Sequence, residues 1–251
     1  MVNDRLKSAI RSAGLTSQEL SERIQVDPKT IDRWVASGRQ PHAANRRRLA
    51  LALGADEDFL WPNALSDSQI QEVSQSELVH IYTSRAMIPV AAWETMLANT
   101  SESLDVLAFA ASFLHDALPN LHDDLRDRAS AGVRVRLLLA DPDSEAVAVR
   151  GEEEHIGSSL AERCRLSWKY FRPLLDVPNV EARMHSSTLY ASMFRFDDDL
   201  LLNHHLLGAP ASQSSVQHLH RLPAGRLFGN AVASLERAWH GARPVTGTEL
   251  P

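Results

Sequence analysis

The chain has 251 residues, of which 44% are hydrophobic and 23% are charged, and this length and composition suit two globular domains. The formal net charge of -6 argues against a protein that binds nucleic acid over its whole surface. The charge is unevenly distributed, because residues 1–62 carry ten basic and eight acidic residues whereas the remainder is acidic. A nucleic-acid-binding segment is therefore expected only at the N-terminal end.

The N-terminal segment is predicted to form a bundle of short helices. Residues 3–13 and 43–53 contain apolar residues at helical spacing, and each stretch ends at a glycine, Gly14 and Gly54. Residues 58–62 read as a last apolar turn that is closed by proline.

Residues 16–39, TSQELSERIQVDPKTIDRWVASGR, are predicted to form two helices separated by a tight turn. Thr16 and Glu19 have the spacing of a capping box at the start of the first helix. Asp27 followed by proline starts the second helix, and Gly38 ends it. The pattern leaves the start and outer face of the second helix exposed, which is the part of a helix-turn-helix that enters the major groove of DNA.

Residues 3–62 resemble the Xre/phage-repressor class of helix-turn-helix domains, in the order capping box, apolar turn, D-P-K-T-I-x-R-W, G-R-x-P and R-R-R-L-A-x-x-L-G. The resemblance implies an all-α DNA-binding domain of a sequence-specific transcriptional regulator. Because one module contacts few base pairs and its charge surplus is small, we expect a homodimer on double-stranded DNA. The resemblance implies phosphate contact at Gln18 and base contact at Lys29 and Arg33, whereas Pro28 replaces a residue that is often polar. The expected DNA-contacting residues are Gln18, Pro28, Lys29, Thr30, Arg33, Arg39, Arg46 and Arg47.

A second domain is predicted after a polar linker at residues 63–76, and it extends over residues 77–245, before a tail at 246–251. Strands are expected at 78–84, 103–111, 133–143 and 179–187, and a hairpin at 188–208. Helices are expected from residue 89 and over 118–132, 144–170 and 226–241. Alternating strands and helices predict a multidomain chain in which the second domain is α/β, with a mixed, largely parallel sheet flanked by helices.

The segment GVRVRLLLADPD, followed by a strand, a hairpin and a final amphipathic helix, is similar to one half of the phospholipase D-like fold. This similarity covers roughly residues 78–241. The second domain is also similar to a sensor domain found beside Xre-type helix-turn-helix domains in actinobacterial regulators, and this similarity joins both halves of the chain.

The phospholipase D resemblance implies a catalytic motif, H-x-K-x4-D, that this chain does not contain intact. When the motif aspartate is matched to Asp197, the histidine falls on Tyr190 and the lysine on Ser192. A phenol is a poor nucleophile at neutral pH, and serine supplies no positive charge. A start at His185 leaves Ser187 for lysine and no aspartate at the fitting distance. We therefore expect no catalytic residues and a protein that is not an enzyme.

A pocket for a small polar ligand is expected outside the carboxyl ends of the strands, where open α/β sheets bind ligands. Arg172 is the expected counter-charge for an anionic ligand. The expected ligand-binding residues are Asp141, Arg172, His185, Tyr190, Ser192, Asn203 and His205.

The leading hypothesis is a transcriptional regulator whose phospholipase D-like domain senses a ligand, forms a dimer, or both. The alternatives are a phosphodiesterase or nuclease targeted by a DNA-binding module, and a regulator whose second domain is only a dimerisation scaffold. An open polar pocket, rather than one filled by side chains such as Phe194 and Phe196, would argue against the scaffold.

No cofactor and no metal site are expected. The single cysteine, Cys164, excludes a cysteine-based zinc site, and His218 and His220 lack a nearby carboxylate at a useful spacing. The polar start of the chain and the absence of a long apolar run predict a cytoplasmic protein without membrane contact.

Overall fold

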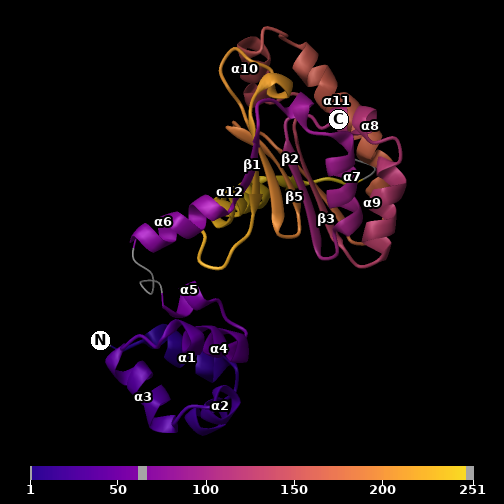
Figure 1. Cartoon of the computed structure of the whole chain (residues 1–251). Coiled ribbons are helices and arrows are strands. Elements are labelled where there is room, and N and C mark those ends of the chain that lie inside the picture. The colour runs from indigo at the N-terminus through magenta and orange to yellow at the C-terminus, as the bar shows by residue number, and fades with distance from the viewer. Residues whose placement is uncertain (1, 62–66, 247–251) are drawn as a thin grey trace. The chain divides into compact units, whose positions relative to one another are not determined.

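The computed structural model describes residues 2–61 and 67–246, and the chain divides into two compact units (Figure 1). The N-terminal unit comprises residues 1–75 with 222–225, and the α/β unit comprises residues 76–221 with 226–251. Residues 63–66 of the expected linker and 247–251 of the expected tail lie outside the described residues. The rest of the expected linker forms a helix, α6, over Asp67–Ser76.

Five short helices precede α6 in the N-terminal unit. They are α1 (Asp4–Ser12), α2 (Ser17–Ile24), α3 (Pro28–Ser37), α4 (Ala43–Leu53) and α5 (Glu57–Leu60). Their apolar faces meet in one core, and the side chains buried there include Leu6, Leu20, Ile24, Ile31, Trp34, Leu49, Leu60 and Trp61.

Local sequence signals define the boundaries of α2 and α3. The Thr16 hydroxyl accepts from the Glu19 backbone N–H at 3.2 Å, while the Glu19 carboxylate accepts from the Thr16 N–H at 2.8 Å, which completes the capping box. The Asp27 carboxylate accepts from the Lys29 N–H at 2.8 Å at the start of α3. Gly38 ends α3 at a φ of 62°, a conformation that glycine adopts without strain.

The α/β unit contains one eight-stranded sheet, and its strands are β1 (Leu78–Tyr82), β2 (Ser103–Ala108), β3 (Arg134–Ala140), β4 (Val180–His185), β5 (Ala191–Phe196), β6 (Asp199–His204), β7 (Val216–His220) and β8 (Arg243–Pro244). Its helices are α7 (Val90–Asn99), α8 (Phe113–Ala117), α9 (Leu121–Ser130), α10 (Glu145–Glu153), α11 (Ser159–Phe171) and α12 (Leu227–Gly241). Three single 3-10 turns are η1 (Arg85–Met87), η2 (Arg172–Leu174) and η3 (Ala211–Gln213).

The sheet is mixed, but the prediction that it is largely parallel is wrong. The strand order is β1-β7-β6-β5-β2-β3-β4-β8. Strands β2, β3 and β4 run parallel, and the other described ladders are antiparallel. The difference arises because the β5–β6 hairpin extends into β7, a strand that sequence patterning did not predict, and this antiparallel group pairs with β2 through β5.

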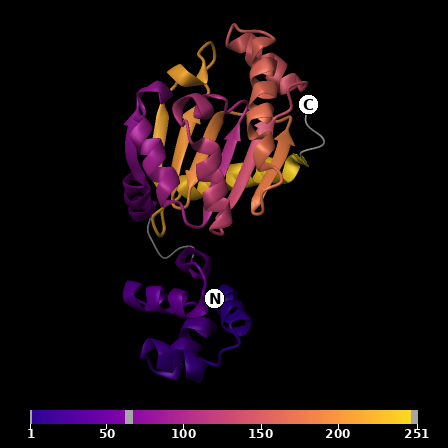
Figure 2. The same ribbon diagram turned by 90° about the vertical axis from the view of Figure 1, so that its right-hand side faces the viewer.

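Helices cover both faces of the sheet, as Figure 2 shows with α12 in yellow on one face. On the first face, α7, α8 and α9 pack on alternate residues of the central strands such as Val106 and Leu137. On the second face, α12 packs on the intervening residues such as Leu107 and Leu138. Helix α11 contributes to both cores, which fixes it across the carboxyl ends of the parallel strands.

The predicted long helix over residues 144–170 is two helices, α10 and α11. His155 and Gly157 have φ values of 56° and 50°, which break the helical path between them. The two helices approach so closely that a Cβ at Gly151 would lie 2.2 Å from the Gly157 carbonyl oxygen. The break turns the start of α11 toward the loop that follows β2, where the Cys164 thiol donates to the Phe109 carbonyl at 3.3 Å.

Candidate functional site

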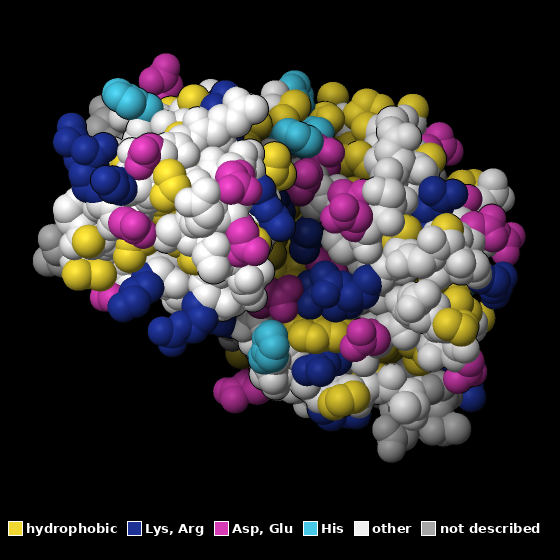
Figure 3. Space-filling model, turned by 90° about the horizontal axis from the view of Figure 1, so that it is seen from below, with side chains coloured by type: hydrophobic (Ala, Val, Ile, Leu, Met, Phe, Trp, Pro, Cys, Tyr) yellow, Lys and Arg dark blue, Asp and Glu magenta, His cyan; other side chains and the backbone are white. Residues whose placement is uncertain are grey.

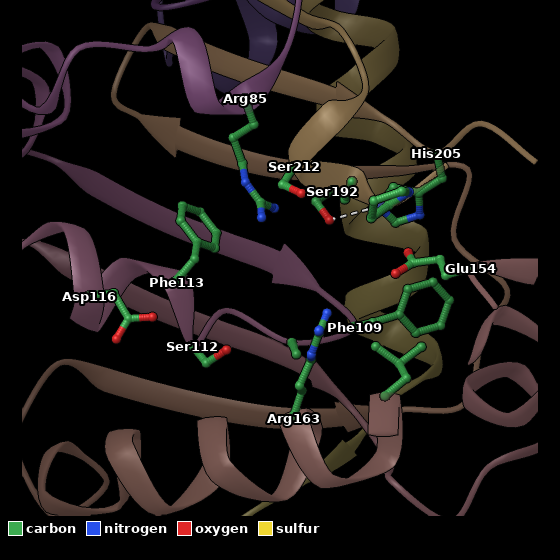
Figure 4. A pocket seen from close by; sticks show the side chains of 14 residues that line it. Arg85, Phe109, Ser112, Phe113, Asp116, Glu154, Arg163, Ser192, His205 and Ser212 are labelled. Carbon is green, nitrogen blue, oxygen red and sulfur yellow. Dashed lines mark hydrogen bonds between the residues drawn. The ribbon is translucent and has the colours of Figure 1, made fainter. Parts of the chain in front are cut away.

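An open cavity of about 310 Å³ lies in the α/β unit, beyond the carboxyl end of β2 (Figure 4). Its walls come from η1, the β2–α8 loop, α8, α11, β5 and the loop between β6 and η3. The polar or aromatic residues that line it are Arg85, Phe109, Ser112, Phe113, Asp116, Glu154, Arg163, Ser192, His205 and Ser212.

Arg85 enters the cavity from η1. Its guanidinium carbon lies 3.8 Å from the centre of the Phe113 ring, and one N–H donates to the Asn203 side-chain oxygen at 3.4 Å. Asn203 is fully buried and donates to the carbonyls of Ser214 and Ser215, so the acceptor for Arg85 is held in place. Burial lowers the pKa of Arg85 to about 10, and the guanidinium therefore keeps its charge at neutral pH.

Arg163 supplies a second positive charge from α11. In Figure 4 its side chain points into the cavity from the helix below, opposite Arg85. Among the described residues, the Arg163 guanidinium has no ion-pair partner, whereas the neighbouring Arg165 on the same helix pairs with Asp143 and Glu162. Glu154, on the cavity wall, is already neutralised by Arg150 at 2.8 Å. The Asp116 carboxylate also lines the cavity, and among the described residues it has no ion-pair partner. Two arginines and one uncompensated carboxylate leave the cavity with a net positive charge, which suits an anionic group.

Ser192 and His205 form a hydrogen-bonded pair at the back of the cavity. The Ser192 Oγ lies 2.9 Å from Nε2 of His205, and Nδ1 of His205 lies 3.1 Å from the Leu189 carbonyl oxygen. The Phe109 ring stacks on the imidazole with centroids 5.6 Å apart. Burial, followed by the charge of Arg150, lowers the pKa of His205 to about 4.

The cavity brings together only part of the expected ligand-binding set. Ser192 and His205 line it, and Asn203 lies directly behind Arg85. Tyr190 is 82% exposed and is not among the lining residues, although its backbone carbonyl accepts from the His205 N–H. The expected sharing of a site by Tyr190 and Ser192 is therefore not observed, because Ser192 is buried in the sheet and Tyr190 precedes β5.

The other three expected ligand residues also lie outside the cavity lining. His185 is buried, and its Nε2 lies 3.1 Å from the Ala108 carbonyl oxygen. Asp141 follows β3, where its carboxylate accepts from the Asp143 N–H. Arg172 is exposed at η2, at the end of α11 remote from the lining residues Leu160 and Arg163. The two arginines that line this cavity are Arg85 and Arg163, and Arg172 is not among the lining residues.

No local sequence signal identified Arg85 or Arg163, because they are 78 positions apart and neither belongs to a recognisable motif. The register of α11 contains a partial signal. Leu160, Cys164 and Ser167 are buried on one side of the helix, so Arg163 lies next to that face and not opposite it. Arg163 is exposed, and it lies at the open side of the cavity that it lines.

Most of the expected DNA-contacting residues of the N-terminal unit are exposed; the exceptions are the half-buried Pro28 and Thr30 and the buried Arg46. Lys29, Arg33, Arg39 and Arg47 are exposed, and the first two belong to α3. Pro28 and Thr30 are half-buried at the start of α3, and the exposed Gln18 side chain donates to Glu22 at 2.9 Å. Over the face seen in Figure 3, Lys and Arg side chains are interspersed with Asp and Glu and do not form one continuous basic surface.

Arg46 is the exception that has a structural role. Its side chain is 9% exposed, it pairs with Glu57 at 2.7 Å, and it donates to the Pro41 carbonyl at 3.0 Å. It therefore joins α4 to the start of α5, and little of its side chain is exposed. The run of three arginines concealed this role, because sequence alone does not show which one points inward.

The histidines of β7 differ from the expectation as well. His218 and His220 share one carboxylate oxygen of Asp199, at 2.7 Å and 3.1 Å, so a carboxylate lies beside them after all. Burial would raise the pKa of Asp199, but the hydrogen bonds from the two histidines outweigh it and lower the pKa. Within residues 2–61 and 67–246, no group of three or more His, Cys, Asp or Glu side chains is placed so that it could hold a metal ion.

Comparisons with known proteins give low-identity structural similarities. No protein-family model and no curated protein matches the chain. The archaeal chromatin protein TrmBL2, described as having a novel mode of DNA binding, is 13% identical over 71% of this chain, with a TM-score of 0.41. The chain spans 61% of the TrmBL2 chain.

Two further solved structures are also similar. Nuc from Salmonella typhimurium, a phospholipase D family member, is 12% identical over 62% of this chain and 90% of its own, with a TM-score of 0.35. Phosphatidylserine synthase from Haemophilus influenzae Rd KW20 is 13% identical over 68% of this chain and 40% of its own, with a TM-score of 0.45. An α/β phospholipase D-like domain is consistent with these similarities. None of them identifies the Xre class in the N-terminal unit.

The prediction that the chain is not an enzyme is contradicted by the same comparison. The similar structures include a phospholipase D family member and a phosphatidylserine synthase. Within the described residues, no helix has the length and apolar character needed to cross a membrane.

Proposed function

We propose that the chain is a DNA-binding protein whose α/β unit hydrolyses phosphodiesters. The observation that carries the proposal is the convergence of Arg85 and Arg163 on one open cavity beside Ser192 and His205. A phosphodiester carries a negative charge that is shared by two oxygens. A described carboxylate in this cavity cannot bind that charge, whereas two guanidinium groups bind it with charge-assisted hydrogen bonds.

The electrostatics of the cavity favour an anion for two separate reasons. Arg85 is desolvated and stacked on Phe113, so a bound anion regains for it part of the solvation lost on burial. Arg163 has no ion-pair partner among the described residues, so phosphate does not need to displace a carboxylate from it. Phe194 and Phe196 pack in the core beneath α7 and do not fill the cavity, which argues against a purely structural domain.

DNA binding is proposed from the α2–α3 pair of the N-terminal unit. The capping box, the Asp27 cap and the Gly38 terminus support a helix-turn-helix in which α3 is the recognition helix. Lys29 and Arg33 are exposed on α3 and would contact base edges, whereas Arg47 would contact phosphate. The small basic surplus of this unit favours a homodimer that reads a near-palindrome, with recognition helices about 34 Å apart.

A second candidate function is a transcriptional regulator of the Xre type, in which the same cavity senses an anionic ligand. The observation that favours it is the agreement of α2 and α3 with the helix boundaries of the helix-turn-helix pattern. Such a ligand can change DNA affinity only by its differential affinity for two states of the protein, typically about 1–3 kcal/mol. Operator affinity measured with and without inorganic phosphate separates this function from hydrolysis alone.

The test of the proposed function compares the full chain with Arg85→Met and Arg163→Met. Hydrolysis of bis(p-nitrophenyl) phosphate and binding of diethyl phosphate by calorimetry are the two measurements. Loss of a hydrogen bond between charged groups costs about 1.5–3 kcal/mol, so each variant should bind the diester about tenfold to a hundredfold more weakly. Arg165→Met is the matched control, because Arg165 lies on the same helix and pairs with Asp143 outside the cavity. Unchanged binding in both variants would exclude this cavity as a phosphodiester site.

A further inference from the structure

We propose that Ser192 is the nucleophile of the α/β unit and that His205 is its general base. This inference rests on the proposed function, since it names the groups that act on a phosphodiester held by Arg85 and Arg163. It also gives a role to position 192, where a serine in place of the motif lysine supplies no positive charge. The positive charge comes from the two arginines, and the hydroxyl is free to react.

The hydrogen bonds determine the protonation of His205. A backbone carbonyl can only accept, so Nδ1 of His205 carries the hydrogen that it donates to Leu189 at 3.1 Å. The neutral imidazole then has its lone pair on Nε2, and the Ser192 hydroxyl donates to it at 2.9 Å. A hydroxyl that donates to a nitrogen whose ring is oriented by a third group is the arrangement that activates a nucleophile.

The surroundings of the pair keep it in this state. Phe109 stacks on the imidazole and fixes its plane, and Leu189 is buried. Burial and the charges of Arg150 and Arg85 keep His205 neutral at pH 7, because they lower its pKa. A bound phosphodiester anion would offset the charge of Arg85, which is one of the causes that lower the pKa of His205.

The reaction proceeds in two balanced half-reactions with water as the co-substrate. The Ser192 Oγ attacks phosphorus while its proton passes to Nε2 of His205, and the bond from phosphorus to the leaving oxygen breaks. That oxygen takes the proton from Nε2 and departs as an alcohol. Water then attacks the phosphorus of the serine-linked diester, which still carries the second ester group, and gives a proton to Nε2; the Oγ–phosphorus bond breaks, and Oγ recovers the proton. The net result is one diester and one water converted to a monoester and an alcohol.

Two other hydroxyls line the cavity, and their surroundings distinguish them from Ser192. Ser112 and Ser212 are half-buried, and within the described part of the chain neither hydroxyl is hydrogen-bonded to a histidine or carboxylate. Without a base, a serine hydroxyl is a weak nucleophile at neutral pH. An adduct on either of them instead of Ser192 would overturn the inference.

The first test is covalent labelling of the full-length protein with a fluorophosphonate probe, followed by peptide mass spectrometry. We expect a single phosphonyl adduct on Ser192. Ser192→Ala should abolish labelling, and His205→Gln should slow it by at least about 100-fold, the usual contribution of a general base. Ser186→Ala is the control, because Ser186 is exposed and does not line the cavity. No adduct on Ser192, or equal labelling rates in wild type and His205→Gln, would overturn the inference.

The second test separates this inference from the proposed function. If the wild type hydrolyses bis(p-nitrophenyl) phosphate and Ser192→Ala retains that rate, Ser192 is not the nucleophile, but the phosphodiesterase function stands. If the wild type neither binds nor hydrolyses diesters, the proposed function fails, and the fluorophosphonate adduct still decides whether Ser192 is activated. Support requires loss of turnover by at least about 100-fold in Ser192→Ala, with diester binding retained.

Discussion

Acidification from pH 7.5 to pH 5 should destabilise the α/β unit through His205. Its pKa is lowered from the ordinary value of 6.5 to about 4 in the folded protein, mainly by burial. Because the folded pKa lies below the unfolded one, the unfolded chain binds the proton first as pH falls. The stabilisation is therefore complete above pH 6.5 and is lost progressively down to the folded pKa.

The magnitude follows from the size of the shift. At about 1.4 kcal/mol per pKa unit, the full loss is about 3 kcal/mol, of which about 2 kcal/mol is lost between pH 7.5 and pH 5. His205→Gln removes the titrating group and should remove that part of the pH dependence. The difference between the two proteins isolates His205 from the buried His185, whose pKa is also lowered by burial.

Native-state hydrogen exchange of amides in β2, β3 and β5, measured against urea at several pH values, reports the unfolding free energy of this unit separately from the other. His80→Gln is the control, since His80 is an exposed strand histidine. Equal pH slopes for wild type and His205→Gln between pH 7.5 and pH 5 would refute the burial of a neutral imidazole at this position.

Four further substitutions test other parts of the structure. Arg33→Ala should weaken duplex binding by about 1–3 kcal/mol and relax the preference at one base pair, which selection from random duplexes measures. Arg47→Ala should weaken binding to all duplexes alike. Arg46→Ala should instead lower the unfolding free energy of the N-terminal unit by about 1.5–3 kcal/mol, because the buried ion pair is lost. Equal effects of the two variants on stability would contradict this prediction. Alanine in place of glycine within a helix ordinarily raises the unfolding free energy by about 1 kcal/mol. Gly151→Ala should instead lower it in urea unfolding, because the new Cβ would lie 2.2 Å from the Gly157 carbonyl oxygen.

Sequence reasoning succeeded where the determining interactions are local. The Thr16 capping box, the Asp27 cap and the Gly38 terminus each depend on residues fewer than five positions apart, and all three occur as predicted. The β5–β6 hairpin was likewise predicted, because its turn and its alternation lie within one short segment.

Sheet direction and strand order could not be obtained in the same way. Strand β7 spans Val216–His220, and only Val216 and Leu219 of it are buried, so its pattern is too weak to indicate a strand without its partners. Its place between β1 and β6 converts half of the sheet to antiparallel pairing. Pairing between strands that are far apart in the sequence produces no periodicity in the sequence, so periodicity cannot predict it.

The cavity shows why a motif search can misjudge a site of this type. Matching the motif lysine to Ser192 assumes that one position on one strand supplies both the orientation and the positive charge. In the structure these two requirements are met by different elements, since η1 and α11 contribute Arg85 and Arg163 while β5 contributes a hydroxyl. Electrostatic attraction acts through space, so a cation from any element that borders the cavity can serve. Orientation of a nucleophile, in contrast, requires direct contact, and Ser192 obtains it from His205, on the segment that follows the neighbouring strand β6. The functional groups of a degenerate motif are therefore better judged by what borders the cavity than by what occupies the motif positions.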